Sequence, residues 1–153
     1  MELETQAAFD PASFEHIPVL LNECLEGLAI DPAGTYLDGT AGGAGHSAAI
    51  AAKLSPEGKL IAFDQDPDAV KTAGVRLSSY PNAQIVQENF RNMAGVLREM
   101  GVSGVDGVLL DLGVSSHQLD EAERGFSYLH DAPLDMRMSQ NGLSAYDVVN
   151  TWP

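Results

Sequence analysis

The chain has 153 residues, of which 44% are hydrophobic, and 22 acidic residues against 8 lysines and arginines give it a net charge of −14. This length and composition predict one globular domain with a buried core and exclude a disordered chain. The negative charge argues against a nucleic-acid-binding surface built from these residues alone, because phosphate contacts need clustered cations.

Two further properties of the sequence indicate the cellular compartment of the protein. The apolar runs are too short to span a membrane and no secretory leader pattern opens the chain, so we expect a cytoplasmic protein with no membrane partner. The single cysteine, Cys24, excludes an internal disulfide and suits a reducing compartment. We expect Cys24 to be a small buried hydrophobic residue of a helix.

Hydrophobic periodicity and turn signals predict alternating helices and strands after a flexible acidic tail at residues 1–15. Such alternation is typical of an α/β fold with a parallel sheet and right-handed crossovers. Residues 112–142 show no clear period, and so long a loop in a compact domain is usually functional or unfinished. In chain order, the predicted elements are a helix at 19–28, a strand at 35–37, a helix at 46–54, a strand at 59–63, a helix at 67–77, a strand at 83–87, a helix at 91–100, a strand at 105–110 and a helix at 144–152.

The most informative stretch is the glycine-rich loop between the first predicted strand and the helix after it. It reads Asp-Gly-Thr-Ala-Gly-Gly-Ala-Gly-His-Ser over residues 38–47. A strand, a glycine loop and a helix in this order bring bare backbone N–H groups and a helix N-terminus against a nucleotide-like ligand. The pattern resembles the first motif of S-adenosylmethionine-dependent methyltransferases, with Thr40 and Ala44 where that motif has glycine.

Polar residues also follow each later strand. In an open parallel sheet the ligand lies at the carboxyl ends of the strands, so Asp38, Asp64, Asn89–Phe90 and Asp111 are expected to converge on one crevice. Asp64 is predicted to accept hydrogen bonds from both ribose hydroxyls of a cofactor, and its charge disfavours NADP. The alternative role for Asp64, as N-cap of the next helix, suits Asp66 better.

Two other side chains are candidates for ligand contact. Phe90 is predicted either to pack against an adenine face or to belong to the core, and the sequence does not decide between them. His46 opens the helix after the glycine loop, where it either contacts the ligand or is an ordinary helix-terminal residue. No metal site is predicted, because the four histidines, His16, His46, His117 and His130, lack ligand spacing.

The sequence after the fourth strand, residues 111–118, lies where amino-directed methyltransferases commonly place an acid or amide followed by two prolines and an aromatic residue. This chain has the acid, Asp111, but neither the prolines nor the aromatic residue. An exocyclic amine has a delocalised lone pair, so acceptors have to hold its hydrogens while the lone pair turns toward the methyl group. Asp111, Ser115 or backbone carbonyls are the candidate catalytic acceptors, and the sequence does not choose among them. Cys24 precedes the cofactor loop and is a poor candidate for the nucleophile that a pyrimidine C5-methyltransferase needs.

Several longer strings together resemble the ribosomal RNA small subunit methyltransferase H family, also called the MraW type. The resemblance covers nearly everything from His16 to the end of the chain. The last string is the most specific, because no general structural need dictates it. The strings are His-x-x-Val-Leu-Leu at 16–21, the glycine loop at 38–47, Asp-x-Asp-Pro at 64–67, Leu-Leu-Asp-Leu-Gly-Val-Ser-Ser-x-Gln-Leu-Asp at 109–120, and Glu-Arg-Gly-Phe-Ser-Tyr with Pro-Leu-Asp-Met-Arg-Met within 123–138.

This resemblance implies a Rossmann-like sheet that serves S-adenosylmethionine-dependent methyl transfer to the N4 amine of a cytosine in small-subunit ribosomal RNA. The ribosomal RNA is then the expected partner, and formation of a homodimer is left open. By position, the resemblance implies cofactor contacts at Ala44, Gly45, His46, Asp64, Phe90, Asp111 and Gln118.

Members of that family are much longer than this chain. Residues 16–153 are therefore interpreted as the N-terminal, cofactor-binding part of the methyltransferase domain, without the substrate-recognition insertion and the remaining strands. The sheet is then incomplete, its fourth strand is an exposed edge, and the chain alone is expected to bind cofactor weakly and to methylate poorly. The rival hypotheses are an NAD-dependent oxidoreductase, which Asp38 and the Asp111 motif disfavour, and a cofactor-binding module without turnover.

Overall fold

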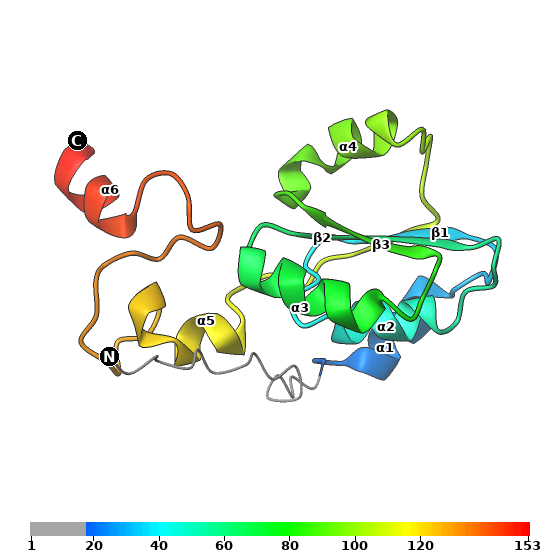
Figure 1. Ribbon diagram of the computed structural model, residues 1–153, viewed down its shortest axis with the longest axis horizontal. Coiled ribbons are helices and arrows are strands. Elements are labelled where there is room, and N and C mark those ends of the chain that lie inside the picture. Colours follow the sequence, from blue (N-terminus) through cyan, green and yellow to red (C-terminus); the bar gives the residue numbers. More distant parts are fainter. Residues whose placement is uncertain (1–17) are drawn as a thin grey trace, which may run out of the picture.

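The centre of the molecule is a four-stranded parallel sheet (Figure 1). The computed structural model describes residues 18–153, so the predicted tail at 1–15, together with His16 and Ile17, lies outside the described residues. The strands β1 (Thr35–Asp38), β2 (Lys59–Asp64), β3 (Ala83–Gln87) and β4 (Gly107–Leu109) lie in the order β3-β2-β1-β4. The predicted α/β fold is confirmed, and β4 is an edge strand as expected.

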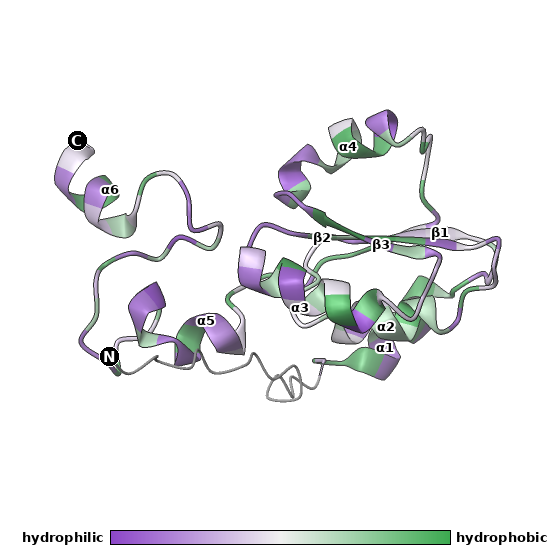
Figure 2. Cartoon of the chain, in the orientation of Figure 1, coloured by the Kyte–Doolittle hydropathy of each residue, from purple (hydrophilic) through white to green (hydrophobic). Residues whose placement is uncertain are grey.

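Helices cover both faces of the sheet (Figure 1), and α1 to α3 lie on the face opposite α4. Because side chains alternate along a strand, Tyr36, Leu60 and Ala62 pack toward α2 and α3, while Leu37, Ile61 and Phe63 pack toward α4. Figure 2 shows hydrophobic residues on the sheet and on the helices that pack against it. The helices are α1 (Leu21–Leu28), α2 (Gly45–Ala51), α3 (Pro67–Leu77), the 3-10 turn η2 (Phe90–Asn92), α4 (Met93–Glu99), α5 (Ser116–Asp120), the 3-10 turn η3 (Ala122–Arg124) and α6 (Ala145–Thr151).

The first helix is shorter than the predicted span of 19–28. Leu20 has a φ of 52°, in the left-handed region, so the helix begins only at Leu21. Pro18 consequently precedes the helix and packs against Gly45, where an added Cβ would meet the proline Cγ at 2.3 Å. Cys24 is half-buried, which corrects the expectation of a buried core residue.

The fourth strand covers three residues instead of the predicted 105–110, for a specific reason. Asp106 forms two hydrogen bonds with Thr35: its N–H donates to the Thr35 carbonyl, and its carboxylate accepts the Thr35 N–H, each at 2.7 Å. The side chain thus takes the place of the next backbone ladder bond, and regular pairing begins only at Gly107.

Within residues 112–142, where the sequence showed no clear period, the structure has two short elements, α5 and η3, and residues 125–143 form no helix or strand. A capping box closes the N-terminus of α5, since Ser115 and Gln118 exchange hydrogen bonds between side chain and backbone. A second capping box, from Ser144 and Asp147, starts α6 and confirms the predicted last helix. Among residues 18–153, no helix combines the length and the hydropathy that crossing a bilayer requires.

Candidate functional site

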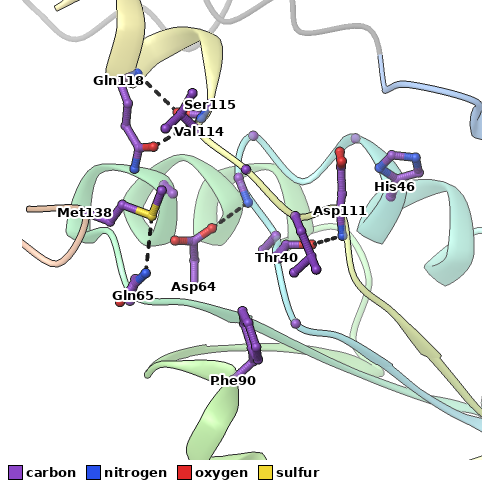
Figure 3. Close-up of a pocket in the computed structure, with 18 of the residues that line it drawn as sticks. Thr40, His46, Asp64, Gln65, Phe90, Asp111, Val114, Ser115, Gln118 and Met138 are labelled. Atoms are coloured by element: carbon purple, nitrogen blue, oxygen red, sulfur yellow. Dashed lines mark hydrogen bonds between the residues drawn. The ribbon is translucent and has the colours of Figure 1, made fainter. Parts of the chain in front are cut away.

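A cavity of about 360 Å³ lies at the carboxyl ends of the strands (Figure 3). The connections β1–β2–β3 progress in one direction across the sheet, and the chain then returns to place β4 on the other side of β1. This reversal is the topological switch point, where open α/β sheets form a ligand crevice. The volume falls in the range of pockets that hold nucleotide-sized ligands.

Most of the residues predicted to form the site line this cavity, although they come from loops far apart in the sequence. The loops after β1, β2, β3 and β4 all contribute, as parallel strands with a common carboxyl edge require. Asp38 and Ala44 are the two exceptions. The predicted residues that line the cavity are Gly45, His46, Asp64, Asn89, Phe90, Asp111, Ser115 and Gln118.

Asp38 is buried beneath the glycine loop and does not line the cavity, which corrects the expectation that it faces the crevice. Its carboxylate accepts hydrogen bonds from the Ser47 hydroxyl at 2.6 Å and the Thr40 N–H at 3.0 Å. Burial raises the pKa of Asp38 above its ordinary value, and these hydrogen bonds offset only part of the effect. The acid before the glycines therefore ties the loop to α2.

Ala44 also lies outside the lining of the cavity. Its side chain is fully buried in the core between the sheet and α2. Its N–H donates to the Ala41 carbonyl at 2.7 Å, so neither its methyl group nor its N–H is presented to a ligand. The φ of Ala44 is 59°, a conformation that glycine adopts most readily, which is why the generic motif has glycine here.

Asp64 has the geometry that a ribose-binding carboxylate needs. Its Oδ2 accepts the Gly42 N–H at 2.8 Å and its Oδ1 accepts the Asp66 N–H at 2.9 Å (Figure 3). Each carboxylate oxygen retains a lone pair for a hydroxyl donor. Burial raises the pKa of Asp64, and the two N–H groups counteract that rise. As predicted, Asp66 instead caps α3 by accepting the Asp68 N–H at 3.1 Å.

Phe90 and His46 line opposite parts of the cavity (Figure 3). Phe90 also packs on the glycine loop, where a Cβ added to Gly39 would lie 3.1 Å from the Phe90 Cβ. Phe90 thus packs on the loop and contributes to the cavity wall and does not belong to either core cluster, while its contact with an adenine stays a prediction. The His46 Nε2 lies 3.0 Å from the Val19 carbonyl, which ties α2 to the segment before α1.

Asp111 and Ser115 stand at the mouth of the cavity after β4. The Asp111 N–H donates to the Thr40 hydroxyl at 2.7 Å, and Asp111 is otherwise exposed. Ser115 is half-buried, and its hydroxyl accepts the Gln118 N–H at 3.1 Å. The Gln118 amide in turn accepts the Ser115 N–H at 3.1 Å and donates to Asp66 at 2.9 Å. Gln118 thus holds the cavity wall in place.

Sequence reasoning missed several residues of the lining, including Gln65, Met138 and Val114. Gln65 follows directly after Asp64, so its position at a strand end was a usable signal. Its amide accepts from Asn89 at 2.9 Å and donates to the Met138 sulfur at 3.4 Å. Met138 lies 73 residues away from Gln65 in the sequence, so no local pattern places it at the cavity.

The residues present fit an adenosyl cofactor. Asp64 offers acceptors for two hydroxyls, while Phe90, Leu112, Val114 and Met138 offer apolar or soft surface for a purine and for methylene groups. The carboxylates of Asp64 and Asp111 suit the positive charge of a sulfonium. No group of three metal-ligating side chains comes together in residues 18–153.

The chain is similar in sequence to curated proteins. Ribosomal RNA small subunit methyltransferase H of Brevibacillus brevis is 57% identical over 142 residues, which cover 92% of this chain and 45% of that protein. The protein of the same name from Clostridioides difficile is 59% identical over 141 residues, which cover 91% and 45%. The chain therefore spans about 45% of the length of these curated relatives.

A solved structure shares the fold. A Clostridium thermocellum protein described as an rRNA-methylase superposes with a TM-score of 0.53 and 18% identity, covering 66% of this chain and 57% of that one. The model of the MraW methylase family matches residues 13–153. The chain belongs to the MraW methylase family.

Proposed function

We propose that this protein takes part in S-adenosylmethionine-dependent methylation of small-subunit ribosomal RNA, at the N4 amine of a cytosine. The observation that carries the proposal is the identity of 57% and 59% to two proteins named as ribosomal RNA small subunit methyltransferases. The strand-end cavity supports it, because its acceptors and apolar walls suit an adenosyl group. The cytosine N4 position is the expectation that the sequence motifs imply.

Bound S-adenosylmethionine supplies a methyl group on a positively charged sulfur. Asp64 would hold the ribose hydroxyls through the lone pairs that the Gly42 and Asp66 N–H groups leave available. Those two N–H groups pre-orient the carboxylate, so little reorganisation accompanies binding. Phe90, which follows β3, would offer its ring to the adenine, and the glycine loop would offer the cofactor a backbone surface without bulky side chains; both line the cavity.

The candidate acceptors for the amine were Asp111, Ser115 and backbone carbonyls; of the two side chains, Asp111 is the better placed. The Ser115 hydroxyl already serves as the acceptor of a capping box, whereas Asp111 is an exposed residue of the cavity lining. Its backbone is held by Thr40. The carboxylate holds an amine hydrogen and thereby turns the nitrogen lone pair toward the methyl group, which is an effect of orientation.

Two other expectations remain proposals. A cytoplasmic location suits a protein that acts on ribosomal RNA. The formation of a homodimer is tested by measuring the mass of the protein in solution. Membership of a methylase family disfavours the rival function of an NAD-dependent oxidoreductase.

The experiment is a calorimetric titration of this chain with S-adenosylmethionine and, separately, with NAD. We expect binding of S-adenosylmethionine alone. We also expect a loss of about tenfold to a hundredfold in affinity for Asp64→Ala, in which two charge-assisted hydrogen bonds are removed. Asp131→Ala, which removes an exposed acid outside the cavity, should bind like the wild type. Binding of NAD by the folded chain would contradict the proposal.

A second measurement addresses the substrate. Small ribosomal subunits that lack the modification are incubated with labelled S-adenosylmethionine and either this chain or a full-length relative, and the labelled nucleoside is then identified. N4-methylcytidine in the full-length reaction, reduced in the equivalent of Asp111→Asn, would support the assignment. Label on a base carbon or on ribose would overturn it.

A further inference from the structure

The buried carboxylate of Asp66 accepts hydrogen bonds from four residues, Asp68, Gln118, Arg124 and, at 3.4 Å, Gln140. It is 2% exposed and accepts the Asp68 N–H at the start of α3. It also accepts hydrogen bonds from the Gln118 amide at 2.9 Å and from an Arg124 Nη2 at 2.8 Å. Burial acts to raise the pKa of Asp66, but the hydrogen bonds from Arg124, Gln118 and the Asp68 N–H, together with the charge of Arg124, hold it below its ordinary value.

Arg124 connects the Asp66 carboxylate to residues 137–138, which follow η3 in the chain. Its side chain is 11% exposed. The guanidinium donates to Asp68 at 3.2 Å and to the carbonyl oxygens of Arg137 and Met138 at 3.3 and 3.1 Å. One planar group therefore joins the first turn of α3 to the backbone of residues 137–138, and a lysine with a single nitrogen has no equivalent geometry.

The hydrogen bonds of Asp66 and Arg124 connect to the cofactor cavity by two routes, one through Asp64 and one through Met138. On one side, the Asp66 N–H donates to Asp64 Oδ1 at 2.9 Å, so fixing Asp66 orients the predicted ribose acceptor. On the other side, the carbonyl that Arg124 holds belongs to Met138, whose side chain lines the cavity with its sulfur 3.4 Å from the Gln65 amide. Figure 3 shows Met138 and Gln65 beside Asp64.

We propose that Arg124 is a positioning residue for the adenosyl cofactor, and that Met138, which it holds, forms the cavity wall at the nucleoside end. This inference rests on the proposed function and deepens it. Arg124 touches neither the cofactor nor the substrate; it acts through Asp66 and through the Met138 backbone. The thioether of Met138 supplies a soft, polarizable surface for the nucleoside.

The test compares two arginines of the same segment. Arg137 pairs with Asp135 only two residues away, at 2.6 Å, so Arg137→Lys changes a local contact and not the link to α3. Affinity for S-adenosylhomocysteine is measured by calorimetry on the folded protein, with unfolding followed separately. We expect Arg124→Lys to bind about tenfold more weakly, and Arg137→Lys to stay within about twofold of the wild type.

A second variant tests the route through Met138. Met138 is half-buried at the cavity, so Met138→Ala should leave the fold intact and weaken binding by about fivefold to tenfold. Met138→Leu, which keeps the apolar volume, should restore most of the affinity. In the double variant with Arg124→Lys, the two losses should be less than additive, because one acts partly through the other.

The outcomes separate the two claims. A folded wild-type chain that binds no S-adenosyl compound would overturn the proposed function and this inference with it. If the wild type binds, but Arg124→Lys lowers only the unfolding midpoint and leaves the affinity unchanged, the positioning role is wrong and the proposed function stands. Losses that add fully in the double variant would likewise contradict the route through Met138.

Discussion

The Ser47 hydroxyl donates a 2.6 Å hydrogen bond to the carboxylate of Asp38, and both residues are completely buried. The pair joins the start of α2 to the end of β1 directly beneath the glycine loop. We expect Ser47→Ala to lower the free energy of unfolding by about 1–3 kcal/mol, because a buried acceptor loses its donor. Urea unfolding measures this change.

The matched control is Ser78→Ala. The Ser78 hydroxyl donates to the Val75 carbonyl on an exposed helix end, so its loss should change the free energy of unfolding by less than about 0.5 kcal/mol. Equal midpoints for the two variants would show that the buried pair contributes no more than a surface hydrogen bond.

The raised pKa of Asp38 gives a pH dependence with a definite sign. Burial raises this pKa above the ordinary value of 3.8, so the folded state holds the proton more tightly than the unfolded state. The contribution to stability therefore falls as the pH rises from about 3.8 to the folded pKa, and is constant above it. Asp38→Asn does not titrate, so the stability of the wild type relative to Asp38→Asn should decline over that interval.

Several other carboxyl groups titrate in the opposite direction, so the comparison has to be a difference between two proteins. Asp66, Asp135 and Asp147 have pKa values lowered by their hydrogen-bond partners. The contributions of these groups to the free energy of unfolding are lost as the pH falls below the ordinary carboxyl range. Both proteins contain these groups, so the contributions cancel when wild type and Asp38→Asn are compared at each pH. A difference that rises with pH would refute the assignment.

The hydroxyl of Thr40 should control the order of the loop that carries Asp111. It accepts the Asp111 N–H at 2.7 Å, and Thr40→Val keeps the shape of the side chain without the acceptor. We expect faster hydrogen exchange at the Asp111 amide and a loss of about 1 kcal/mol in unfolding free energy. Thr40→Ser, which retains the hydroxyl, should exchange like the wild type; protection that survives in Thr40→Val would contradict the role.

Gly42 and Gly101 offer a matched pair for the glycine loop. Both have a positive φ, +49° and +72°, and at neither position would an added Cβ meet another atom within 4 Å. Alanine at each site should therefore lower the unfolding free energy by a similar amount, about 1–2 kcal/mol, from backbone strain. Only Gly42 lines the cavity, so only Gly42→Ala should also reduce the affinity for S-adenosylmethionine, which calorimetry measures. If Gly42→Ala and Gly101→Ala reduced the affinity equally, backbone strain would be the cause, and not the space that the new methyl group takes up in the cavity.

The sequence alone determined the features that depend on local periodicity and on chain order. Alternating strands and helices predicted the parallel sheet, and the carboxyl ends of its strands then placed Asp64, Phe90 and Asp111 at one edge. The N-cap role of Asp66 was also readable, because Pro67 follows it and the bond to the Asp68 N–H spans only two residues. Interactions of this range need no knowledge of the fold.

Only the tertiary structure decided which side chains distant in the sequence form hydrogen bonds with one another and which are buried. Asp38 stands at a strand end like Asp64, yet the hydroxyl of Ser47 and the packing of α2 bury it below the loop. The Glu123–Met138 string had no general structural explanation in the sequence; in the fold, Arg124 bonds to Asp66 across 58 positions and holds Met138 at the cavity. Hydrophobic periodicity predicts which face of a helix or strand a residue occupies. Hydrogen bonds such as Asp38–Ser47 and Asp66–Arg124 form only when folding brings the two segments into contact, so periodicity does not predict them.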